Sequence, residues 1–204
     1  MNNIKAMLAV SIAIAGLTTS SLAQPELLRD PDFSGTLDGS NPAWGTFGAA
    51  GINDFFNGNA HGSLFSDNPG NFGGIFDAGI AGVAGATYTF TLTDVRIEEN
   101  FDADLRFGLE FYQTDNSTPS GPFSLSIISD SSSTAQTGDG LMFTMTATAP
   151  AGTEWVRPIV QFDNVRSTAG GQENVFVFDA RLVPTPGTAG VGLLAAGALA
   201  RRRR

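Results

Sequence analysis

The chain lacks the residues on which many catalytic and metal sites depend. Its 204 residues include no cysteine and one histidine, His61. Without cysteine there can be no disulfide framework, thiolate metal site or cysteine nucleophile. One histidine excludes multi-histidine metal sites, and a catalytic triad would depend on His61 alone. A chain of this length must therefore be held together by its hydrophobic core.

Positive charge is also scarce, and it is concentrated at the two ends. Lys5 is the only lysine, and Arg201, Arg202, Arg203 and Arg204 end the chain. The segment between Gln24 and Pro186 contains six arginines and twenty acidic residues, which gives a net charge of about −14. Such a surface repels nucleic acid phosphates, so we expect no nucleic acid partner.

Helical periodicity is missing from the body of the chain, residues 24–182, and strand periodicity is frequent. Tyr88, Phe90 and Leu92, for example, alternate with threonines. Glycine, with 25 residues, punctuates the runs. Alternation of this kind predicts sheets that pack by their apolar faces. We expect an all-β jelly-roll sandwich. The predicted strands lie within 62–80, 86–95, 104–113, 124–128, 140–149, 154–162 and 174–182.

The first 23 residues have the layout of a secretory signal peptide. A short basic start precedes an apolar stretch from Ala6 to Leu17, and a small-residue cleavage site ends at Ala23. We expect a signal helix, cleavage after Ala23 and export of the body. The alternative is a retained N-terminal anchor.

The last 22 residues, 183–204, form a second targeting segment. Pro184, Thr185 and Pro186 precede an apolar run, and four arginines follow it. The run, Gly187 to Ala200, would reach about 21 Å as a helix, against a hydrocarbon core of ~30 Å. The arginines favour the cytoplasmic side. We expect a short transmembrane helix with the body outside.

This order of features resembles the PEP-CTERM sorting signal, although the usual Pro-Glu-Pro is Pro-Thr-Pro here. The resemblance implies recognition by an exosortase-type processing enzyme. It also implies an inner-membrane anchor before processing, and a final place in the envelope, on the surface or in the extracellular matrix of a bacterium. The alternative is a plain C-terminal membrane anchor.

The body resembles the galactose-binding-like jelly rolls of carbohydrate-binding modules. The resemblance rests on the stretch from Gly85 to Tyr88 and on the pair Phe178-Asp179 in the closing strand. It implies polysaccharide binding, and a structural calcium held by Asp30, Asp32 and Asp179. Calcium prefers six to eight oxygen ligands. The family's glutamate is replaced by Ser34, so one oxygen ligand is missing.

Two predicted strands carry charged and aromatic residues at alternate positions. Sugar sites need aromatic platforms and planar polar groups. The alternative is an ordinary solvated sheet face. The candidate ligand-binding residues are Arg106, Glu110, Tyr112, Trp155, Arg157 and Gln161.

Other groups are interpreted as structural. His61 could pair with Ser63 and an aspartate, but no nucleophile motif is near it, so it is interpreted as a surface or ligand-edge histidine. Trp44 is assigned to a loop, and Phe55 with Phe56 to a plug at the end of the sandwich. The alternative is that all three are loop aromatics at the sugar site. The carboxylates of Glu98, Glu99, Asp102 and Asp104 are interpreted as a solvated turn.

We therefore expect an exported, non-enzymatic polysaccharide-binding protein. The alternatives are a structural envelope or matrix protein without a specific ligand, and a glycan-active enzyme that would use such paired carboxylates.

Overall fold

A computed structural model describes residues 24–66, 68–130, 137–167 and 173–185. The predicted signal peptide, the apolar run and the arginine cluster lie outside the described residues, together with Ala23 and Pro186. Within the described ranges, no helix is both long and apolar enough to cross a membrane.

The described chain consists of one short helix and eleven strands. In chain order they are α1 (Ser34–Asp38), β1 (Trp44–Gly48), β2 (Ala50–Phe56), β3 (Asn59–Ser66), β4 (Gly73–Asp77), β5 (Ile80–Ala81), β6 (Thr87–Ile97), β7 (Asp102–Tyr112), β8 (Ser124–Ser129), β9 (Gly138–Thr148), β10 (Trp155–Ser167) and β11 (Glu173–Thr185).

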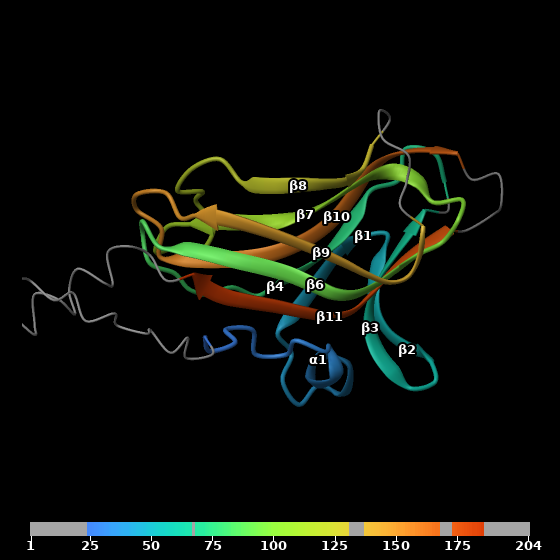
Figure 1. The fold of residues 1–204 in the computed structure, drawn as a ribbon, viewed down its shortest axis with the longest axis horizontal. Coiled ribbons are helices and arrows are strands. Elements are labelled where there is room, and N and C mark those ends of the chain that lie inside the picture. Colours follow the sequence, from blue (N-terminus) through green and yellow to red (C-terminus); the bar gives the residue numbers. More distant parts are fainter. Residues whose placement is uncertain (1–23, 67, 131–136, 168–172, 186–204) are drawn as a thin grey trace, which may run out of the picture.

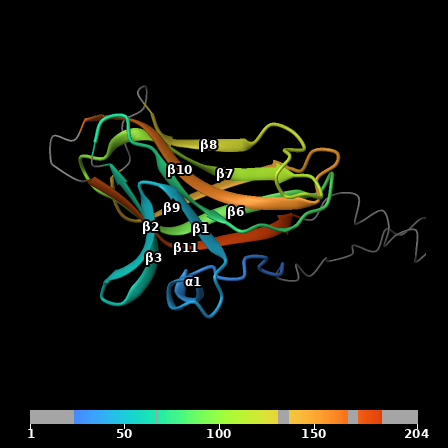
Figure 2. The same cartoon turned by 180° about the vertical axis from the view of Figure 1, so that it is seen from behind.

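The strands form two antiparallel sheets packed face to face, which confirms the predicted all-β sandwich (Figure 1). The first sheet has the order β1-β4-β10-β7-β8, and β5 pairs with β10. The second sheet has the order β2-β3-β11-β6-β9. Both views place α1 beside the β2–β3 hairpin, at one side of the sandwich (Figures 1 and 2).

The core lies between the sheets and is built from the alternating residues. Phe90 and Leu92 of β6 are fully buried, and so are Leu105 and Leu109 of β7. The intervening threonines of β6 face outward, where Thr89 and Thr91 bond to threonine hydroxyls of β9. Period-two patterning therefore predicted which face of each long strand is buried.

The last strand is longer than the sequence indicated. β11 continues to Thr185, past the predicted domain boundary at Leu182 and into the proline tripeptide. Thr185 Oγ1 lies 2.8 Å from Thr89 Oγ1 of β6. At the other end, Glu26 Oε1 accepts a hydrogen bond from the Leu182 amide at 2.8 Å. The chain is thus tied to the sandwich within three residues of the predicted cleavage site.

The region before residue 62 differs most from the sequence predictions. Trp44 opens β1 instead of lying in a loop, and its indole Nε1 donates to the Asp30 carbonyl at 2.7 Å. Phe55 and Phe56 belong to β2 and pack on the outer face of the second sheet, against Phe176, instead of plugging an end. Glycines interrupt the alternation in this region, so its strands were not recognised.

Candidate functional site

The six predicted ligand-binding residues come together on the outer face of the first sheet. They form three directly opposed pairs across β7 and β10, in which each residue of β10 faces one of β7. The pairs are Trp155 with Tyr112, Arg157 with Glu110, and Gln161 with Arg106.

Three of these residues bind one another. Arg157 Nε donates to Glu110 Oε2 at 2.6 Å, and the Tyr112 hydroxyl donates to the same oxygen at 3.0 Å. Arg157 also donates to the Tyr112 hydroxyl oxygen. Burial and the neighbouring Glu110 carboxylate raise the pKa of Tyr112 to about 12, so its hydroxyl stays protonated. Glu110 and Tyr112 therefore hold the guanidinium of Arg157 in place.

The charges of this face are largely neutralised within it. Arg106 donates to Asp163 at 2.7 Å and lies 3.4 Å from Asp104. Arg157 is paired with Glu110, whose side chain is only 8% exposed. A ligand on this face therefore meets hydrogen-bonding groups with little net charge.

A row of aromatic rings, which sequence analysis missed, crosses the same face. The ring centroids of Phe72 and Phe47 are 6.4 Å apart, and those of Phe47 and Phe76 are 6.3 Å apart. The Arg157 guanidinium lies 5.0 Å from the Phe76 ring centroid and 4.4 Å from that of Tyr112. Phe123 follows, 5.7 Å from Tyr112. We call this row the aromatic stripe; it consists of Phe72, Phe47, Phe76, Arg157, Tyr112 and Phe123.

Glycines on the neighbouring strands let two of these rings lie close to the backbone. A Cβ at Gly45 would stand 2.6 Å from Phe76 Cζ, and one at Gly74 would stand 2.6 Å from Phe47 Cζ. Each ring thus occupies the space of a side chain that glycine lacks. The same glycines break the period-two pattern, so the sequence indicated Arg157 and Tyr112 of the stripe but not Phe47 and Phe76.

Both ends of the stripe, and the surface beyond one of them, expose apolar side chains to solvent. Phe72 is 59% exposed, at the start of the stripe, and Phe123 is 39% exposed at its end. Leu125 and Ile127 of β8 continue the exposed apolar surface beyond it, at 37% and 57% exposure. Exposed apolar side chains gathered on one face are typical of an interaction surface.

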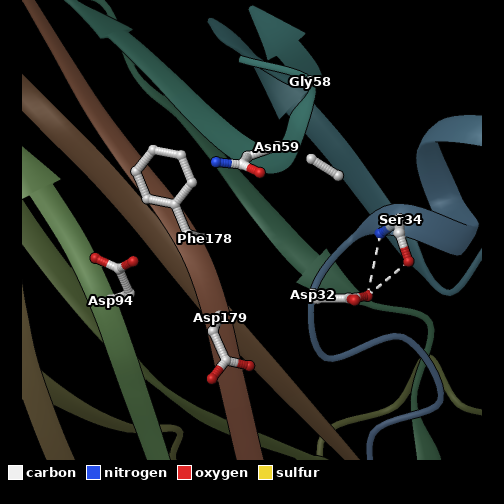
Figure 3. Close-up of a pocket in the computed structure, with 8 residues that line it drawn as sticks. Asp32, Ser34, Gly58, Asn59, Asp94, Phe178 and Asp179 are labelled. Carbon is white, nitrogen blue, oxygen red and sulfur yellow. Dashed lines mark hydrogen bonds between the residues drawn. The ribbon is translucent and has the colours of Figure 1, made fainter. Parts of the chain in front are cut away.

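The three predicted calcium ligands are only partly brought together. Asp32 and Asp179 line one hollow of about 340 Å³, together with Asp94 and Asn59 (Figure 3). Asp30 does not line this hollow; it is buried, and its two carboxylate oxygens accept hydrogen bonds from the amides of Gly35 at 2.9 Å and Thr36 at 2.6 Å. Asp30 thus stabilises the turn that begins α1.

The remaining oxygens do not form a preassembled calcium cage. Asp32 Oδ1 accepts the Ser34 hydroxyl at 2.7 Å, and Asp179 Oδ2 accepts the Thr93 hydroxyl (Figure 3 shows the Ser34 bonds). In the part of the chain that the structure describes, no three His, Cys, Asp or Glu side chains are grouped so that they could hold a metal ion. The residues present therefore do not fit the calcium that the resemblance implies.

Asp102, Asp104, His61 and Ser63, which were considered for catalysis, make structural contacts. Arg166 bonds Asp102 at 2.7 Å and also bonds Asp104. His61 is fully buried, not at the surface as expected, among four phenylalanine rings. Ser63 accepts a hydrogen bond from Asn53 at 3.0 Å.

Comparison with known proteins gives a fold and no family assignment. No protein-family model and no curated protein matches the chain. Among solved structures, TmCBM61 in complex with β-1,4-galactotriose superposes with a TM-score of 0.52 at 12% identity, covering 79% of this chain and 99% of that one.

Two larger structures are also similar. The CBM22-1–CBM22-2 tandem domain of Xyn10C from Paenibacillus barcinonensis has a TM-score of 0.50 at 10% identity, covering 83% of this chain and 47% of that one. The enzymatically active domain of tailspike protein 4 from bacteriophage CBA120 has a TM-score of 0.52 at 7% identity, covering 70% of this chain and 19% of that one. This chain thus spans less than half of either protein. The described residues have the β-sandwich fold found in carbohydrate-binding modules.

Proposed function

We propose that this protein is an exported, non-enzymatic polysaccharide-binding protein whose jelly-roll body binds glycan chains through the aromatic stripe. One observation carries the proposal. A row of rings and one ring-stacked guanidinium crosses an open sheet face whose arginines are already paired with carboxylates.

The chemistry of this face suits a neutral sugar chain. Sugar rings have apolar C–H faces that pack on aromatic rings, and equatorial hydroxyls that bond planar polar groups. Gln161, Arg106 and Trp155 lie beside the stripe and can supply such groups. The likeness to the fold of carbohydrate-binding modules supports the same assignment.

Both ends of the sequence support a place outside the cytoplasm. The predicted signal peptide directs the body across the inner membrane, and the tail that resembles a PEP-CTERM signal holds it there until an exosortase-type enzyme acts. The protein would then reside in the envelope, on the surface or in the extracellular matrix.

Binding to an array of neutral oligosaccharides, including β-1,4-galactotriose, tests this proposal. We expect the purified body, residues 24–185, to bind at least one glycan. Phe72→Ala/Phe76→Ala should weaken that binding by at least about tenfold, because two stacking contacts of about 1 kcal/mol each are lost. Met142→Ala, which removes an exposed apolar side chain from the other sheet, is the control and should bind like wild type.

The array also separates the alternatives. A body that folds but binds no glycan favours a structural matrix protein without a specific ligand. Release of shortened glycans from the array would favour the third function, a glycan-active enzyme.

A further inference from the structure

A groove lies on the opposite side of the sandwich from the stripe. It consists of three adjoining hollows of about 340, 250 and 410 Å³ on the outer face of the second sheet. The first and middle hollows share Asn59, Asp94 and Phe178, while the middle and last share Arg96 and Asp139. The hollows therefore adjoin one another, and we call the three together the groove; the first is drawn in Figure 3.

The middle hollow combines aromatic rings with amide, carboxylate and guanidinium groups. Phe56 and Phe178 supply the rings, and Asn57 and Asn59 the amides. Two carboxylates and the guanidinium of Arg96 complete the lining. Arg96 is held in place, because its Cζ lies 5.1 Å from the Phe56 ring centroid and its Nε lies 3.2 Å from an Asp139 carboxylate oxygen.

Irregularities in the sheet build the groove. The register of β6 shifts against β9 after Leu92 and against β11 on both sides of Asp179. Asp94 and Asp179 consequently face each other across β6 and β11. On the other side, Asn57 and Gly58 both have positive φ, 55° and 74°, and they form the hairpin turn that brings Asn59 to the rim.

The rings of the groove are held rigidly by the packing beneath them. The rings of Phe56 and Phe178 lie 5.3 Å and 5.1 Å from the fully buried imidazole of His61. Phe56 also packs edge-on against Phe176 at 4.7 Å. Fixed rings offer a binding surface that loses little conformational entropy when a ligand is bound.

We propose that the groove is a second saccharide-binding site, which makes each molecule bivalent and able to bridge two polysaccharide chains. Two amides, two carboxylates and a guanidinium beside two rings match the hydroxyl pairs and apolar face of a pyranose. The carboxylates favour neutral sugars over anionic ones. Saccharide binding in the groove does not depend on the proposed function of the stripe. The bridging of two polysaccharide chains also rests on that proposed function.

Two double variants separate the sites. Asn59→Ala/Asp94→Asn alters two exposed groove residues, and Phe72→Ala/Phe76→Ala alters the stripe. Asp38→Asn/Asn100→Ala makes the same chemical changes at exposed positions outside both surfaces and serves as the control. Thermal unfolding of each variant checks that the fold is retained.

The first readout is the array of neutral oligosaccharides used for the stripe. We expect the stripe variant to keep binding to some glycans and the groove variant to keep binding to others, while the combination of all four substitutions binds none. Loss of all glycan binding in the stripe variant would refute the second site. It would leave the function proposed for the stripe unchanged. Loss of all binding in the groove variant alone would instead refute the function proposed for the stripe.

The second readout is agglutination of beads coated with the best-bound glycan, using protein shown to be monomeric by light scattering. Bivalent binding raises avidity by two or more orders of magnitude. We expect each double variant to need at least a tenfold higher concentration than wild type and the control to agglutinate the beads. Unchanged agglutination by the groove variant would overturn the proposal.

Discussion

At the scale of single residues, Arg157 shapes the stripe without presenting a free charge. Its guanidinium is hydrogen-bonded to Glu110 and Tyr112 and lies over two rings. A paired guanidinium that stacks on rings acts as a further flat surface in the row. Of the residues predicted to contact a ligand directly, Glu110 and Tyr112 thus position the guanidinium of Arg157.

The pair of Arg157 and Glu110 should contribute measurably to stability. Arg157→Ala leaves the Glu110 carboxylate, whose side chain is 8% exposed, without its cation. We expect the free energy of unfolding to fall by about 2 kcal/mol, less than for a fully buried pair because Arg157 itself is partly exposed. Urea unfolding measures the change.

The matched control for that measurement is Arg181→Ala. Arg181 is 66% exposed, and its Nε lies 3.9 Å from Asp179. Its loss should change the free energy of unfolding by no more than about 0.5 kcal/mol. Equal effects of the two substitutions would contradict the stabilising contribution of the pair of Arg157 and Glu110.

His61 predicts a pH dependence of stability. Its Nδ1–H donates to the Asn59 carbonyl at 2.8 Å, and its buried Nε2 has no hydrogen-bond partner among the described residues. Burial lowers the pKa of His61, although the Asn59 carbonyl and Asp54 oppose the shift. The unfolded chain therefore binds a proton more readily than the folded one as the pH falls through about 6.5.

We therefore expect the free energy of unfolding to fall as the pH is lowered from 7 to 5. His61 is the only histidine, so His61→Phe should remove this contribution without another histidine masking it. Urea unfolding at several pH values measures the slope. A His61 ring that titrates at or above 6.5 by NMR would contradict the prediction.

At the scale of elements, the stripe depends on pairing between strands. Phe76 of β4 lies opposite Gly45 of β1, and its ring covers that glycine. Covering a strand glycine with a cross-strand aromatic ring restores packing that glycine lacks. The flat placement of the ring is therefore a property of two strands together.

Alanine at two glycines should have contrasting effects. At Gly45 the new Cβ meets only the movable end of the Phe76 ring, at 2.6 Å from Cζ. At Gly108 it meets the backbone oxygen of Ser124 at 2.1 Å. Gly45→Ala should reduce glycan binding with little loss of stability, whereas Gly108→Ala should destabilise β7–β8 by more than about 1 kcal/mol. Array binding and thermal unfolding of both variants test this contrast.

The long strands were predictable, and the early ones were not. From Thr87 to Thr93 in β6 and from Asp102 to Phe111 in β7, buried apolar residues stand at every second position, so strand and buried face could both be inferred. Between Trp44 and Asp77 glycines stand where large side chains would reveal the pattern. The predicted ligand residues lie on the long strands β7 and β10. Of the missed phenylalanines, Phe47 and Phe76 lie on the early strands, whereas Phe72 and Phe123 lie in the loops just before β4 and β8.

At the scale of the whole molecule, the outer faces of the two sheets carry different surfaces. The first carries the aromatic stripe with its paired charges, and the second carries a groove rich in carboxylates and amides. Because the faces point in opposite directions, two glycan chains could be bound without competing for space.

Protein isolated from its own host should lack both ends of the printed sequence, because both are expected to be removed by processing. We expect intact mass spectrometry of protein from its own host to give a chain that starts at Gln24 and ends near Pro184 to Gly187. Thr185 is paired in β11, so cleavage there requires that the end of the strand open. A mass that retains Arg204, with the protein in the inner membrane, would contradict processing and leave an anchored β-sandwich.

The sequence by itself determined the all-β class, the buried faces of the long strands and the absence of cysteine chemistry. These properties depend on local alternation and composition, which a linear chain displays directly. Only the tertiary structure decided that Asp30 stabilises a turn, that His61 is buried, and that rings from β1, β4, β7 and the loops before β4 and β8 form one row. Those arrangements depend on strand order and register, which bring together residues far apart in the chain.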